Sequence, residues 1–161
     1  MNRTKRKIAR RKSESGMTLL ELIIACSILI ILASAALPVA RYSIIRGKET
    51  ELRRDLREMK DAIDRYKDAA DKNQIRVEVG SEGYPPDLET LVKGVQMGAS
   101  ADKKIRFLRK IPVDPMTGQA EWGLRAVQDD PDSNSWGGKN VFDVYSKSQG
   151  TAQDGTKYSD W

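Results

Sequence analysis

The chain contains no histidine, and its only cysteine is Cys26. Histidine is the commonest general base of enzymes and the commonest metal ligand, so its absence removes the usual residue from both kinds of site. A single cysteine allows neither an intrachain disulfide nor a cluster of thiolate metal ligands. The G-x-S-x-G motif of serine hydrolases is also missing. These absences predict that the protein is not an enzyme.

The net charge of +5 is concentrated at the N-terminus. Residues 1–16 hold seven basic residues and one acid, Glu14, which leaves 21 basic and 22 acidic residues in the rest of the chain. The positive-inside rule therefore predicts a cytoplasmic N-terminus, with the remainder of the chain on the opposite side of the membrane. That remainder is nearly neutral, so no nucleic-acid partner is expected. The basic run Lys103–Lys110 is the only candidate for a DNA-binding patch, and we interpret it as a solvated helix face.

A long apolar run, residues 17–37, follows the basic leader and contains one charge, Glu21. A helix over residues 17–40 would be roughly 36 Å long, which is enough to cross a hydrocarbon core of about 30 Å. A carboxylate near the bilayer centre costs about 2.5–3.5 kcal/mol or more. Glu21 therefore indicates that the segment ends in a protein assembly rather than in plain lipid. Pro38 removes a backbone hydrogen bond and is expected to loosen the helix.

Two simpler interpretations of this region are open. Thr18 and Glu21 have the spacing of a capping box, which is compatible with any helix that starts here. A basic segment before an apolar run also describes a secretory signal, which Ala33-Ser34-Ala35 would end. The buried charge of Glu21 and an apolar length of about 21 residues disfavour the secretory signal.

The segment Ser15-Gly16-Met17-Thr18-Leu19-Leu20-Glu21 resembles the class III signal of type IV pilins and of the pseudopilins of type II secretion. The resemblance implies that a prepilin peptidase cleaves between Gly16 and Met17 and methylates the new N-terminus of Met17. It also implies that Glu21, the fifth residue of the mature chain, offsets the buried amine of a neighbouring subunit in a helical filament. The predicted parts are then a cleaved leader (1–16), a transmembrane and assembly helix (17–40) and a periplasmic domain (41–161).

The helix is predicted to continue over residues 41–72, because apolar residues recur there with helical spacing. The predicted core-facing stripe consists of Ile45, Leu52, Leu56, Met59, Ile63, Tyr66 and Ala70. Three pairs four residues apart have the acid first, which is the favoured order on a helix, and the remaining charges of this segment are interpreted as a solvated face. These pairs are Glu49–Arg53, Asp61–Arg65 and Asp68–Lys72.

Later segments resemble the major pseudopilin of type II secretion. Residues 83–92 read as a turn and a short helix capped by Asp87, and 107–115 and 142–146 resemble two further motifs of that family. Residues 120–127 and 140–146 are the best strand candidates. The predicted fold class is α+β, with a long N-terminal helix packed on a small antiparallel β-sheet, as in type IV pilins.

The resemblance also implies a structural calcium ion in the C-terminal loop, with ligands from Ser146, Ser148, Asp154 and Asp160. The alternative is a C-terminal turn held by Gly155, Tyr158 and Trp161. A second acidic loop, Asp130-x-Asp132-x-Asn134, starts like an EF-hand. Ser135 and Val141 then stand where that motif needs glycine and glutamate, so we interpret this loop as a solvated turn.

The favoured function is a structural subunit of a type II secretion pseudopilus, a periplasmic filament that drives folded proteins across the outer membrane. The implied partners are other copies of the chain, a prepilin peptidase, the inner-membrane platform and ATPase, and minor pseudopilins. The alternative is a type IV pilus subunit for adhesion, twitching or DNA uptake. Many such pilins close a C-terminal loop with two cysteines, which this chain does not have.

Overall fold

The computed structural model describes residues 16–98, 103–131, 133 and 135–161, without the side chains at positions 35, 37 and 38. The predicted leader therefore lies outside the described residues except for Gly16. The chain divides into two compact units, Met1–Tyr42 and Ser43–Trp161. The first helix, α1 (Leu19–Asp71), contributes residues to both units.

In the first unit, α1 is long and apolar enough to span a membrane, with a mean hydropathy of 2.7 over its best window and no residue of that window buried. Thr18 caps its start, because the Thr18 hydroxyl oxygen accepts a hydrogen bond from the Glu21 amide at 3.2 Å. The predicted capping role of Thr18 is confirmed. The backbone stays helical across Pro38, so the two predicted helical segments are parts of one helix, Leu19–Asp71.

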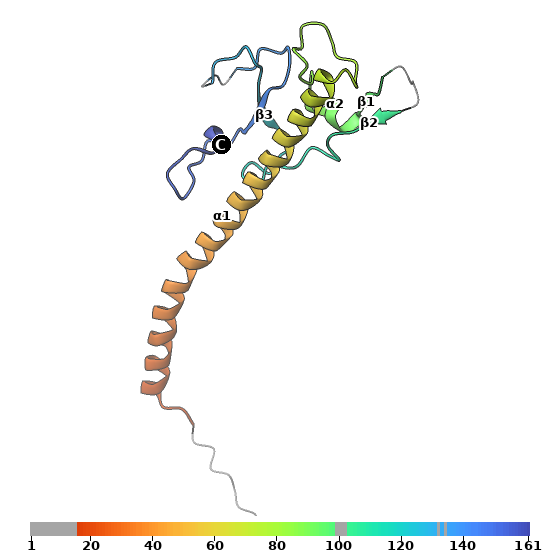
Figure 1. Cartoon of the computed structure of the whole chain (residues 1–161). Coiled ribbons are helices and arrows are strands. Elements are labelled where there is room, and N and C mark those ends of the chain that lie inside the picture. The colour runs from red at the N-terminus through yellow and green to blue at the C-terminus, as the bar shows by residue number, and fades with distance from the viewer. Residues whose placement is uncertain (1–15, 99–102, 132, 134) are drawn as a thin grey trace, which may run out of the picture. The chain divides into compact units, whose positions relative to one another are not determined.

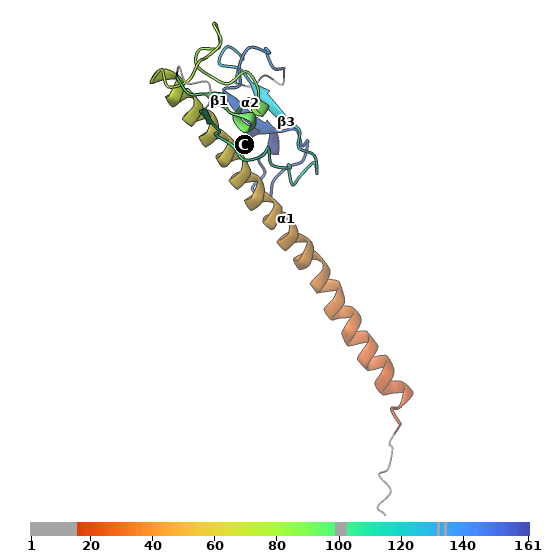
Figure 2. The same ribbon diagram turned by 90° about the vertical axis from the view of Figure 1, so that its right-hand side faces the viewer.

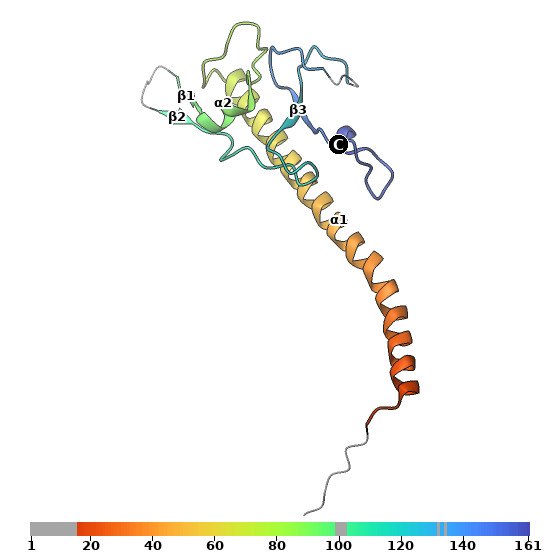
Figure 3. The same cartoon turned by 180° about the vertical axis from the view of Figure 1, so that it is seen from behind.

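The second unit contains the C-terminal half of α1 and all the shorter elements (Figure 1). These are α2 (Leu88–Lys93), β1 (Val95–Gln96), β2 (Lys104–Ile105), β3 (Trp122–Arg125), β4 (Asp143–Ser146) and the 3₁₀ turn η1 (Tyr158–Asp160). Figure 2 shows α2 and β3 on the same side of this half of α1. From behind, β3 appears between the β1–β2 pair and the C-terminal segment (Figure 3). This helix-on-sheet arrangement confirms the predicted α+β fold class.

The predicted stripe of α1 forms the centre of the core. Six of its seven residues are buried, and Leu52, Met59 and Ile63 are fully enclosed, whereas Ile45 stays 42% exposed. The shorter elements supply the other side of the core, which includes Leu91, Phe107, Trp122, Val144 and Tyr158. The rings of Tyr66 and Phe107 meet edge to face with 5.4 Å between their centroids.

In two of the three pairs predicted on α1 the basic residue has another partner, although Asp61 and Arg65 are both exposed, as on a solvated face. Among the described residues, Asp68 and Lys72 lie 3.9 Å apart as predicted. Arg65 instead donates a hydrogen bond to the carbonyl oxygen of Phe107, and Arg53 pairs with Asp154. Long-range partners therefore replace the local ones.

Strands β3 and β4 pair antiparallel and lie inside the two predicted ranges, although each has four residues. Gly123 faces Tyr145 across the pair, and a Cβ atom at position 123 would clash with the Tyr145 ring. The guanidinium group of Arg125 stacks over the Tyr145 ring, with its carbon 4.3 Å from the ring centroid. The glycine thus makes room for an aromatic ring that lies flat across the hairpin.

Helix α2 begins as predicted, because the Asp87 carboxylate accepts the Thr90 amide at 2.6 Å. The helix ends at Gly94, which has a φ of +80° and lies so close to the Ile105 carbonyl that a side chain would clash. That approach brings β1 beside β2, a pairing of two residues each that the sequence analysis missed. The interpretation of Lys103–Lys110 as a helix face is wrong, since β2 and irregular backbone occupy this run.

A buried carboxylate joins the two segments that resemble pseudopilin motifs. Asp114 is fully buried and accepts hydrogen bonds from the Met116 amide at 2.7 Å and the Ser146 hydroxyl at 2.6 Å. Nearby, the indole N–H of Trp122 donates to the Pro112 carbonyl oxygen at 3.0 Å. The segment 107–115 is therefore fixed to both strands of the β3–β4 pair.

We expect Asp114→Asn to lower the stability of the second unit by about 1–3 kcal/mol, because the amide cannot accept all the donors that now surround the carboxylate. The matched control is Asp130→Asn, since Asp130 is exposed. The measurement is thermal unfolding of the full chain in detergent micelles, followed by near-ultraviolet circular dichroism. Equal melting temperatures for the two variants would contradict the structural role of Asp114.

Candidate functional site

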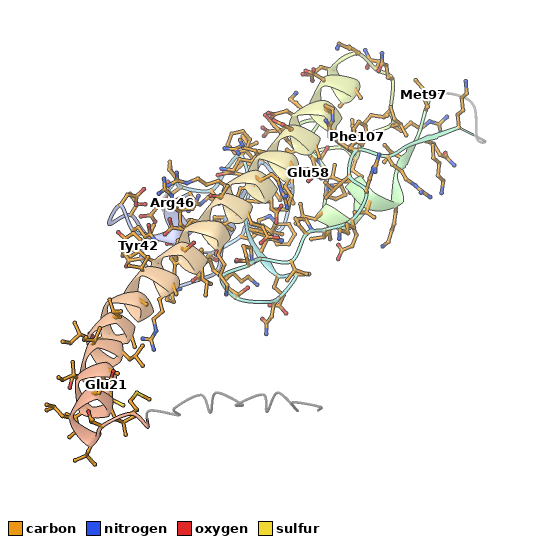
Figure 4. The ribbon with its side chains drawn as sticks, turned by 90° about the horizontal axis from the view of Figure 1, so that it is seen from below. Glu21, Tyr42, Arg46, Glu58, Met97 and Phe107 are labelled. Carbon is orange, nitrogen blue, oxygen red and sulfur yellow. The ribbon has the colours of Figure 1, made fainter. Side chains whose placement is uncertain are left out.

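The residues predicted to be processed lie just before α1. Gly16, Met17 and Thr18 are non-helical and exposed, and no heavy atom beyond the adjoining residues lies within 4 Å of the position that a Cβ would take at Gly16. Glu21 lies in the first turn of α1 and is also exposed (Figure 4). This segment is non-helical and exposed, so its backbone is accessible to a peptidase.

The first unit exposes a continuous apolar helix surface. Its exposed large side chains include Leu19, Leu20, Leu22, Ile23, Ile24, Ile28, Leu29, Ile30, Ile31 and Leu32. A surface of this kind needs a lipid or protein environment. Glu21 is the one acid in its first turn. The arrangement can serve insertion into a bilayer and packing among other apolar helices.

The two serines predicted as calcium ligands form hydrogen bonds within the protein. Ser146 is fully buried; its hydroxyl donates to Asp114 and accepts the Ser148 amide at 3.1 Å. Ser148 in turn accepts the Gly150 amide at 3.3 Å. Both hydroxyls therefore shape the turn that leads out of β4.

Asp154 is held by neighbours on both of its oxygens. One oxygen accepts the amide and the hydroxyl of Thr156, at 3.0 and 2.6 Å, and the other accepts Arg53 at 3.0 Å. The hydrogen bonds from Thr156, followed by the positive charge and hydrogen bond of Arg53, lower the pKa of the Asp154 carboxyl below its ordinary value. Asp154 is thus an ionised capping residue of the C-terminal turn.

The two aspartates predicted as calcium ligands line different cavities. Asp154 lines a cavity beside α1, together with Arg46, Glu49 and Arg53. Ser146 and Asp160 line a different cavity, which also carries the basic residues Arg125, Lys147 and Lys157. The part of the chain that the structure describes contains no group of three or more acidic, cysteine or histidine residues placed to hold a metal ion. In the EF-hand-like loop, Asp132 and Asn134 lie outside the described residues.

Glu49 and Arg53 are functional candidates that the sequence analysis missed. Glu49 is only 9% exposed and accepts the Gln153 amide at 2.9 Å and the Tyr158 hydroxyl at 3.1 Å. Arg53 stacks over the Trp161 ring at 4.0 Å from its centroid. The sequence did contain a signal: the stripe has a seven-residue gap between Ile45 and Leu52, and Glu49 occupies the helical position that fills it.

The C-terminal turn is held by contacts of Gly155, Tyr158 and Trp161. The Tyr158 and Trp161 rings meet edge to face at 5.2 Å, and the Trp161 indole donates to the Thr156 hydroxyl at 2.7 Å. Gly155 has a φ of +88° and donates its amide to the Ala152 carbonyl oxygen. These contacts close the turn.

The comparisons with known proteins find a family motif at the N-terminus of the chain. The family model described as "Prokaryotic N-terminal methylation motif" matches residues 11–37. Neither the curated proteins nor the solved structures that were compared with the chain give a significant match. The motif is the prepilin signal of type IV pilin-like proteins, and it implies processing by a prepilin peptidase and assembly into a filament of the pilus or pseudopilus type.

The lowered pKa of Asp154 predicts a pH-dependent effect of Asp154→Asn. A lowered folded-state pKa means that the carboxylate stabilises the fold above its unfolded pKa, near 3.9, and that this contribution is lost as the pH falls through the folded value. The variant should therefore melt below the unsubstituted chain at pH 7, and the gap should shrink below about pH 4. Circular dichroism melting of the full chain in micelles from pH 7 to about 2.5 measures this gap. A gap that stays constant over that range would contradict the assignment.

Proposed function

We propose that the chain is a structural subunit of a type II secretion pseudopilus. The observation that carries the proposal is the buried hydrogen bond from the Ser146 hydroxyl to Asp114, at 2.6 Å. It joins the segments 107–115 and 142–146, which are the two that resemble the major pseudopilins. Their interlocking gives a structural reason for both motifs to occur in one chain, and it supports a pseudopilin over a generic pilin.

The proposed processing follows from the N-terminal motif. A prepilin peptidase removes residues 1–16 at the exposed Gly16–Met17 bond and methylates Met17. The basic leader holds this bond on the cytoplasmic side of the inner membrane, and the second unit lies in the periplasm. The apolar helix then leaves the bilayer and packs among the same helices of other copies in a periplasmic filament.

Glu21 is proposed to guide this packing. The amine of Met17 becomes cationic after cleavage and is enclosed by apolar helices in the filament. An unpaired buried charge costs several kcal/mol, and the Glu21 carboxylate of a neighbouring copy offsets that cost. Pairing between copies also sets the axial position of each added subunit. The platform, its ATPase and minor pseudopilins are the further partners that this function needs.

The second candidate is a subunit of a type IV pilus for adhesion, twitching or DNA uptake. The N-terminal methylation motif is common to both kinds of filament, so it favours neither. The basic run near β2 is the feature that a DNA-uptake role would use. Its Lys104 side chain, in β2, and its Arg106 side chain, directly after β2, are exposed and do not lie on a helix.

Replacing Glu21 tests the assembly role. We expect Glu21→Ala and Glu21→Gln to be cleaved at Gly16 as before but to form at least about tenfold fewer filaments, since each 1.4 kcal/mol lost is a tenfold change. Glu21→Gln separates the charge from the shape of the side chain. Ser27→Ala, in the same exposed part of α1, is the matched control. Immunoblots report cleavage and electron microscopy reports filaments; filaments of normal length and number from Glu21→Gln would refute the role.

A deletion strain distinguishes the two kinds of filament. If the chain is a pseudopilin, its loss should leave secreted enzymes in the periplasm while surface pili persist. The measurement is the distribution of secreted proteins between periplasm and medium, with pili counted in the same cultures. Complementation with the unsubstituted chain should restore secretion. Normal secretion together with missing pili would assign the chain to a type IV pilus.

A further inference from the structure

One turn of α1 contacts the C-terminal segment, residues 147–161, through two charged side chains. Glu49 and Arg53 lie four residues apart and therefore on the same face of the helix. Each contacts residues more than 100 positions later in the sequence. In Figure 4 the C-terminal segment lies beside α1 near Arg46, which lines the same cavity as Glu49 and Arg53.

The Glu49 contact is the buried half of this arrangement. A buried carboxylate is stable only when donors satisfy it. Glu49 receives the Gln153 amide and the Tyr158 hydroxyl on one oxygen, at 2.9 and 3.1 Å. The C-terminal segment thus depends on α1 for the carboxylate that accepts these two hydrogen bonds.

The Arg53 contact is the exposed half. Its planar guanidinium group pairs with Asp154 at 3.0 Å and stacks on Trp161 at 4.0 Å. A guanidinium group suits this double role because it is always charged and flat. The Trp161 indole donates to the Thr156 hydroxyl, which in turn donates to the Asp154 carboxylate. Arg53 therefore contacts Asp154 and Trp161 at once, and Thr156 links these two residues by hydrogen bonds.

A calcium ion would need a different arrangement. Ca²⁺ takes 6–8 oxygen ligands at about 2.3–2.6 Å. Asp154 already uses both carboxylate oxygens, and the cavity that it lines carries the positive side chains of Arg46 and Arg53. The positive charges of these two arginines would repel a calcium ion bound in the cavity. Asp160, the other acidic ligand that the resemblance implies, lines a separate cavity with three basic residues.

We propose that Arg53 takes the place of a metal ion in this chain. The Arg53 guanidinium group supplies the cation that organises the C-terminal segment, Glu49 supplies the buried anchor, and the segment closes in the same way with or without calcium. Arg53 is a positioning residue in this scheme. The proposal concerns the fold of the second unit and holds for a pilus subunit as well as for a pseudopilin.

Calcium titration of the unsubstituted chain is the first arm of the test. The full chain in detergent micelles is melted in EDTA and in millimolar CaCl₂, with MgCl₂ at the same concentration as the ionic-strength control. We expect the same melting temperature in all three solutions. A ligand that binds the folded chain alone raises its stability. An upward shift that is specific to calcium would therefore overturn the proposal.

Hydrogen exchange of the same protein is the second arm. Arg53→Gln should speed exchange of the amides in residues 150–161 by roughly five- to tenfold, the combined effect of a surface ion pair and a cation–π contact. Arg53→Lys keeps the charge and should recover part of the protection. Arg76→Gln removes an exposed arginine outside this cluster and should leave exchange unchanged. Equal exchange in Arg53→Gln and Arg76→Gln would overturn the proposal.

The calcium arm does not depend on how well the variants fold. If Arg53→Gln fails to fold, Asp154→Asn removes the same ion pair from the opposite side. Its amides in residues 150–161 should then exchange faster by a similar factor, again with no response to calcium. Recovery of protection on adding calcium to either variant would show that a metal ion can organise the segment, which would contradict the proposal.

Discussion

The burial of one apolar stripe on α1 is the constraint on which the rest of the second unit depends. The other elements are too short to be stable alone, since the strands have two or four residues and α2 has six. They persist because Leu91, Phe107 and Val144 pack against the fully buried residues of the helix. The helix itself is held by the same contacts, so its C-terminal half and the small sheet stabilise each other.

Two buried carboxylates give this packing its register. Asp114 joins the segment before β3 to the end of β4, and Glu49 joins α1 to the last turn of the chain. Apolar contacts tolerate small shifts, whereas a buried carboxylate tolerates no loss of its donors. Asp114 therefore fixes two segments that lie 32 residues apart in the sequence, and Glu49 fixes two that lie 109 residues apart.

The sequence predicted the features that local rules govern. The helical stripe, the Asp87 cap and the β3–β4 strands follow from periodicity, capping chemistry and β-propensity. It failed where the partner of a residue lies far along the chain. Glu49 and Arg53 looked like a local ion pair because nothing in their spacing reveals Tyr158 or Asp154. The β1–β2 pair escaped for a related reason: two residues are too few to show alternation, and Gly94 sets the pairing through close approach to Ile105.

The Gly123–Tyr145 pair makes two positions of the hairpin evolutionarily dependent on each other. Position 123 has room for no side chain while a ring occupies position 145, and a smaller residue at 145 would leave a hollow that a larger residue at 123 is free to fill. Substitutions at the two sites are therefore tolerated in compensating pairs rather than singly. Among homologous chains, these two positions should covary in side-chain volume, although 22 residues separate them.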